Sequence, residues 1–206
     1  MTPAAARRLV PPELAAVLAI AAYYALRDPL VPVVAPLFLV ATMSCWARGR
    51  SWADAVRGSR YLAIGAAAGL VALAAAVLAG TPLVELSGRG VEWSQYPIVR
   101  GSPHQLFSVA LLVAISAVAA ELALRGWIVE RALELGASTR VAGAVGALAE
   151  GFVGPGDLAA RAGAAIFGTG LGWMYVAAGR RAGAPIAARV MFGLGAVLLE
   201  GLRLVG

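Results

Sequence analysis

Four ionisable side chains lie inside, or at the border of, apolar stretches long enough to cross a bilayer: Glu121, Arg125, Glu150 and Arg189. A charge in the membrane core costs at least about 2.5 kcal/mol, so such residues normally face the interior of a helix bundle and mark its functional centre. The only histidine, His104, lies in a predicted polar loop, and the sequence contains no asparagine. These residue types allow carboxylate–guanidinium pairing or a carboxylate site, but they do not provide the usual ligands of a catalytic metal.

The elements that must position these side chains are apolar helices. Hydrophobic residues make up 61% of the 206 positions and charged residues only 14%, and the mean hydropathy is +0.82. This composition predicts an all-α, polytopic transmembrane helix bundle. No interleaved basic and aromatic pattern suited to nucleic acid is present, so nucleic-acid binding is not expected. The single cysteine, Cys45, cannot form an internal disulfide and is expected to be buried as a small hydrophobe.

A spanning helix needs about 20 mainly apolar residues, and this length divides the chain into about seven predicted spans. The predicted spans are residues 12–26, 30–47, 61–79, 106–124, 140–153, 158–178 and 184–202. Residues 81–105 are expected to form an extracytoplasmic loop, with Trp93 and Tyr96 as interfacial anchors and His104 as a solvated surface group. Because no linker or clear internal repeat interrupts the sequence, residues 1–206 are expected to form one membrane domain.

The arginines predict the topology. They are more frequent in alternate connections, beginning with Arg7 and Arg8 before the first span and including Arg180 and Arg181 before the last. The positive-inside bias places these connections in the cytoplasm, so the N-terminus is predicted to be cytoplasmic and the C-terminus extracytoplasmic. Abundant alanine, glycine and arginine without any lysine are typical of a GC-rich bacterial genome. The expected location is the bacterial inner membrane, with the first apolar segment retained rather than cleaved as a signal peptide.

Glu121 and Arg125 are four residues apart in the acidic-before-basic order that favours a pair on one helix face. One interpretation is a local ion pair near the lipid headgroups. However, the surrounding segment also resembles the first motif of the CAAX-protease and bacteriocin-processing family of intramembrane proteases. That motif has two glutamates, three residues, an arginine and often a glycine. Glu121, Arg125 and Gly126 match it, whereas Ala120 occupies the position of the first glutamate.

Two later segments resemble the other motifs of this family. In the segment 146–151, Glu150 occupies the position of a family histidine. In the segment 184–189, which opens Ala-Pro-Ile, Arg189 occupies the position of another histidine, and Gly193 that of an asparagine. The resemblance covers approximately residues 106–202 and implies a CAAX-protease-like core.

In that family, the first glutamate and the histidines activate water or bind the metal that does so, and the asparagine assists the developing oxyanion. The resemblance therefore implies a degenerate member that has lost its catalytic residues, and we expect no catalysis, no metal and no cofactor. If the alignment holds, Glu150 and Arg189 replace two facing histidines. We expect them to form an ion pair, with Glu121 and Arg125 as neighbours.

The favoured function is a structural or regulatory subunit of a larger membrane complex, for which an envelope or lipid transporter is one example. The expected partners are other membrane protein subunits and the lipid bilayer. Two alternatives remain open: an intramembrane hydrolase with a site around Glu121 and Glu150, and a transporter of lipids or small molecules. Gly168, Gly170 and Gly172 follow no predicted strand, so small-residue helix packing explains them better than a phosphate loop.

Overall fold

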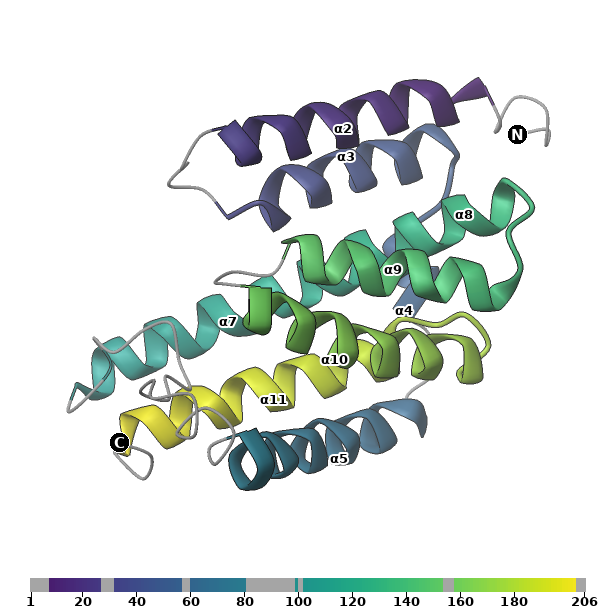
Figure 1. The fold of residues 1–206 in the computed structure, drawn as a ribbon. Helices are drawn as coiled ribbons and strands as arrows, with labels where there is room; N and C mark the ends of the chain where they lie inside the picture. Colours follow the sequence, from purple (N-terminus) through teal and green to yellow (C-terminus); the bar gives the residue numbers. More distant parts are fainter. Residues whose placement is uncertain are drawn as a thin grey trace. The chain divides into compact units, whose positions relative to one another are not determined.

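The computed structural model describes residues 8–26, 32–56, 60–80, 99, 102–153 and 158–202 (Figure 1). Helices joined by turns account for these residues, and no strand occurs among them, so the all-α prediction is confirmed. The chain groups into two compact units, where the sequence predicts a single domain. Unit 1 comprises Met1–Gly58 and Ala119–Pro185, and unit 2 comprises Ser59–Val118 and Ile186–Gly206.

Unit 1 begins with three helices: α2 (Val10–Leu26), α3 (Val34–Ala47) and α4 (Trp52–Val56). Leu37 and Ala41 of α3 form a buried cluster with Ala123 and Trp127 from the middle of the chain. The indole nitrogen of Trp127 donates a hydrogen bond to the Ser44 hydroxyl at 2.9 Å. Apolar burial and this hydrogen bond therefore join the N-terminal helices to the segment that carries the first motif.

A continuous helical run follows from Pro103 to Glu134. It consists of α7 (Pro103–Ala123), the π-helical turn η3 (Leu124–Val129) and α8 (Glu130–Glu134). Gly136 ends it with φ +92°, and the Ala137 and Gly136 amides close the helix on Ala132 and Leu133. Only glycine adopts this left-handed conformation without steric cost, which is why the helix ends there.

The start of α7 corrects one prediction. His104 belongs to the first turn of α7 and is exposed, whereas the sequence analysis placed it in the 81–105 loop. Ser102 accepts a hydrogen bond from the Gln105 amide at 3.4 Å, and Pro103 is the first helical residue. A serine cap followed by proline and, three residues on, glutamine is a helix-start signal, and it determines the boundary.

Unit 1 ends with two neighbouring helices, α9 (Thr139–Val153) and α10 (Leu158–Ala177), which pack along each other. Their backbones approach closely at glycines. A Cβ added to Gly151 would lie 2.9 Å from the Arg161 carbonyl oxygen. Any larger residue at this position would separate the two helices, so the glycine sets their distance.

Unit 2 contains α5 (Arg60–Ala75), η1 (Ala76–Gly80), the first part of α7 and most of α11 (Gly183–Gly201). The glycines of α11 lie against larger side chains of the neighbouring helices. A Cβ at Gly193 would lie 2.6 Å from Val113, and one at Gly201 would lie 2.7 Å from Leu106. As in unit 1, small residues permit the close packing of apolar helices.

Three helices in the described part of the chain are long and apolar enough to cross a membrane: Tyr61–Ala79, Pro103–Glu134 and Gly183–Gly201. They correspond to the predicted spans 61–79, 106–124 and 184–202. The apolar helices Val10–Tyr24 and Val34–Ala47 are shorter, and α9 has only 15 residues. The protein is therefore a helical protein with apolar, membrane-compatible helices, and about seven spans remains a prediction.

Some predicted features fall outside the described residues. They are the turn at 27–29, most of the 81–105 loop with Trp93 and Tyr96, and the break at 154–157 between the fifth and sixth predicted spans.

Candidate functional site

Glu121 and Arg125 lie on one face of the long helical run, as their spacing predicts. Arg125 Nη1 donates a hydrogen bond to Glu121 Oε1 at 3.1 Å, and both side chains are 0% exposed. Arg125 belongs to the π-helical turn η3 rather than to the regular helix. Such wide turns inside α-helices often occur at functional positions, because they change the direction in which one side chain projects.

Glu150 of α9 lies within hydrogen-bonding contact of the same guanidinium. Arg125 Nη1 donates to Glu150 Oε2, and Arg125 Nη2 donates to the Gly168 carbonyl oxygen of α10 at 2.8 Å. One arginine thus bonds to a carboxylate on its own helical run, a carboxylate on α9 and a main-chain carbonyl on α10. We call Glu121, Arg125 and Glu150 the Arg125 cluster. The planar fork of an arginine is well suited to such multiple bonding.

The glycine at position 168 is a geometric requirement of the Arg125 cluster. A Cβ there would lie 2.8 Å from Glu150 Cβ and 3.1 Å from Arg125 Nη2. Contacts this short are not tolerated without moving the helix or the ion pair. The sequence analysis attributed Gly168 to helix packing, and it gave no indication that the Gly168 carbonyl oxygen accepts a hydrogen bond from a motif residue.

The Arg125 cluster is better suited to holding helices together than to catalysis. A guanidinium is always protonated and only donates hydrogen bonds, and here it bonds to one oxygen of each carboxylate, Glu121 Oε1 and Glu150 Oε2. Its positive charge also repels a cation. Among the described residues, no group of three or more histidine, cysteine, aspartate or glutamate side chains could hold a metal ion.

The other motif positions have different surroundings. Ala120 is buried, with 4% exposure, beside the Arg125 cluster on its own helix. Arg189 and Gly193 lie on the part of α11 that belongs to unit 2, where Gly193 packs closely against Val113. The expected pair between Glu150 and Arg189 would join the two units, and it stays a prediction.

A second buried ion pair joins α2 to the end of α3. Arg48 Nη1 donates hydrogen bonds to Glu13 Oε1 and, at 2.6 Å, to the Ser44 hydroxyl. Arg48 Nη2 donates to Glu13 Oε2 at 2.9 Å. The sequence analysis did not select Glu13 or Arg48. The predicted spans 12–26 and 30–47 were the available signal, since a short connection between two antiparallel spans brings residue 13 close to residue 48.

A third polar cluster, Glu130–Tyr175–Arg180, was also missed. Glu130 Oε1 accepts hydrogen bonds from the Tyr175 hydroxyl and from Arg180 Nε, each at 2.8 Å. Arg180 Nη2 donates to the other carboxylate oxygen, Glu130 Oε2. This hydrogen bond raises the pKa of Arg180, and partial burial opposes that rise. The guanidinium therefore stays charged. Glu130 is 45 residues from Tyr175 and 50 from Arg180 in the sequence, and no motif connects them.

Comparison with known proteins gave no matching family model, no matching curated protein and no matching solved structure.

Proposed function

We propose that this chain is a non-catalytic subunit of a larger membrane complex, with a CAAX-protease-like bundle of about seven spans in which the Arg125 cluster fixes helix register. The proposal places it in a bacterial inner membrane, with the N-terminus in the cytoplasm. Its role would be structural or regulatory, and an envelope or lipid transporter is one kind of complex that would fit.

One observation carries the proposal: the Arg125 guanidinium lies in hydrogen-bonding contact with both carboxylates that a glutamate-based site would need. Glu121 and Glu150 each accept a hydrogen bond from Arg125 Nη1. A hydrolase needs a carboxylate that can accept a proton from water. Here both carboxylates already bond to a permanent cation, and such buried ion pairs can specify how helices align.

The described surface supports a protein that acts through its membrane-facing helices. Large apolar side chains are exposed on several of them, for example Leu70 and Val71 on α5, Ile115 on α7 and Leu198 on α11. Apolar surfaces of this kind are covered by lipid or by other helices in a membrane.

The test is gentle affinity purification of the tagged chain from native membranes, followed by mass spectrometry and imaging of the intact particle. We expect a defined set of membrane proteins at constant stoichiometry. An unrelated multi-pass protein carrying the same tag is the control, and it should not recover this set. A particle containing only this chain would contradict the proposal.

The hydrolase alternative has its own test. The purified chain and its Glu121→Gln and Glu150→Gln variants would be incubated with membrane peptide substrates. We expect the same absence of cleavage for all three proteins. Cleavage by the unmodified chain that is lost in both variants, with helix content and melting temperature unchanged, would replace the proposal with an enzyme.

A further inference from the structure

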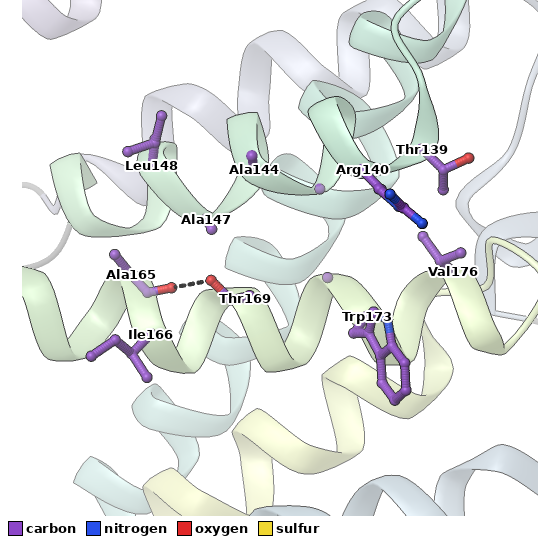
Figure 2. A pocket seen from close by; sticks show the side chains of 12 residues that line it. Thr139, Arg140, Ala144, Ala147, Leu148, Ala165, Ile166, Thr169, Trp173 and Val176 are labelled. Atoms are coloured by element: carbon purple, nitrogen blue, oxygen red, sulfur yellow. Dashed lines mark hydrogen bonds between the residues drawn. The ribbon is translucent and has the colours of Figure 1, made fainter.

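A groove of about 640 Å³ lies between α9 and α10 within unit 1 (Figure 2). Most of the residues that line it are apolar or small. Gly143 lies in its lining, and Leu148, Ile166 and Trp173 line it with exposed fractions of 71%, 75% and 80%. Such large apolar side chains are poorly suited to water, whereas they are suited to contact with hydrocarbon.

The two ends of the groove differ in polarity. Figure 2 shows Arg140 and Thr139 at one end, near Trp173, whereas Leu148 and Ile166 lie at the other. Arg140 is exposed and forms no ion pair with any other described residue. A guanidinium with no acidic partner among the described residues, at one end of an apolar groove, complements a molecule with an anionic head and a hydrocarbon tail.

The middle of the groove offers little hydrogen-bonding capacity. Thr169 lies in this part, and its hydroxyl donates a hydrogen bond to the Ala165 carbonyl oxygen of its own helix at 2.9 Å. Figure 2 shows this bond along the wall of the groove. The hydroxyl proton is therefore already used, and hydrocarbon can fill this part without leaving a donor unsatisfied.

The length of the groove is comparable to the hydrocarbon thickness of one lipid leaflet. Eight residues separate Arg140 from Leu148 along α9, which at 1.5 Å per residue corresponds to about 12 Å. Half of the hydrocarbon core of a bilayer is about 15 Å thick. Trp173 at the charged end also fits this orientation, because tryptophan side chains concentrate at the level of the headgroups.

We propose that this groove binds an anionic phospholipid, with one acyl chain between α9 and α10 and the phosphate held by the Arg140 guanidinium and the Thr139 hydroxyl. The inference requires only that α9 and α10 are accessible to lipid, and it does not depend on a partner complex. The sequence predicts the connection that contains Arg140 to be cytoplasmic, and the inner leaflet is where anionic lipids meet basic residues.

The first test measures the headgroup contact. The detergent-solubilised full chain would be titrated with phosphatidylglycerol or phosphatidylcholine, and bound lipid would be counted by native mass spectrometry. We expect one tight phosphatidylglycerol, about fivefold weaker binding in Arg140→Gln, and no change in Arg181→Gln. Arg181 is an exposed arginine outside the groove, so it is a matched control. Equal binding of both lipids, or equal effects of the two variants, would overturn the proposal.

The second test blocks the acyl chain. A Cβ added at Gly143, in the groove, or at Gly170, outside it, would meet nothing within 4 Å. Gly143→Leu and Gly170→Leu should therefore both fold, as checked by helix content and melting temperature. We expect Gly143→Leu to remove the tight lipid and Gly170→Leu to retain it.

Retention of the lipid in both glycine variants would overturn the proposal, as would its loss in both. If Gly143→Leu keeps the lipid but loses a co-purifying membrane protein, the groove is a protein contact and the proposal is likewise wrong.

Discussion

Two ionic clusters in unit 1 use the same chemistry in different surroundings. In the Arg125 cluster, the side chains of Glu121, Arg125 and Glu150 are 0%, 0% and 7% exposed. In the Glu130–Tyr175–Arg180 cluster, the arginine side chain is 51% exposed. The first cluster is buried throughout, and one cation pairs with two carboxylates. In the second cluster one cation pairs with one carboxylate, and only the arginine reaches solvent, because the Glu130 side chain is 9% exposed.

This difference determines how much each arginine matters. Removing one partner from a buried ion pair leaves a charge that neither water nor protein stabilises, so the loss is large. At Arg180 the loss should be smaller, because water reaches the arginine and the Tyr175 hydroxyl still donates to the buried Glu130 carboxylate. The same pairing of glutamate with arginine should therefore contribute more to stability at Arg125 than at Arg180. The following predictions test this contrast, from the largest expected effect to the smallest.

Arg125→Met should reduce the free energy of unfolding by about 3–5 kcal/mol, because it leaves Glu121 and Glu150 buried without their shared cation. Thermal unfolding in mild detergent would measure the loss. As a control, methionine at all three positions of the Arg125 cluster should lose less, because none of the three charges of the cluster remains buried. A triple variant no more stable than Arg125→Met would contradict this account.

Glu150→Arg should destabilise the chain by a comparable amount, about 3 kcal/mol or more, because it places a second guanidinium beside Arg125. If Glu150 also pairs with Arg189, as the sequence predicts, adding Arg189→Glu should restore about half of the loss or more. The comparison of the single and double variants by thermal unfolding measures this coupling. Strictly additive losses would exclude the pair.

Gly168→Ala should lower stability by about 1–3 kcal/mol, because its Cβ would clash with Glu150 and Arg125. Gly170→Ala on the same helix is the matched control, since a Cβ there meets nothing within 4 Å. It should raise stability by up to about 1 kcal/mol through better helix propensity. Equal melting temperatures for the two variants would show that the close approach at Gly168 is not required.

Arg180→Gln should lower stability by about 1–2 kcal/mol, less than Arg125→Met, because half of the arginine side chain is exposed and Tyr175 still donates to Glu130. Arg180 also has φ +63°, a conformation that costs a non-glycine residue about 1–2 kcal/mol. Arg180→Gly should therefore be at least as stable as Arg180→Gln. An effect as large as that of Arg125→Met would remove the distinction between the two clusters.

Local signals in the sequence predicted much of the helical framework. The apolar runs predicted α5, the main part of α7 and α11 within a few residues. The spacing of Glu121 and Arg125 placed both on one helix face. The start of α7 was misplaced, although the Ser102–Pro103–Gln105 pattern was there to be read. These features depend on neighbours within one or two turns, and such interactions are encoded locally.

The sequence by itself determined that the chain is helical and apolar, and it identified Glu121, Arg125 and Glu150 as charges that need partners. Only the tertiary structure decided that one guanidinium serves both carboxylates, that the Gly168 carbonyl completes the set, and that Glu130 pairs with Tyr175 and Arg180. The physical reason is distance along the chain. Helix periodicity fixes which residues share a face within one helix, but contacts between helices depend on packing, and a glycine without a Cβ allows that packing here.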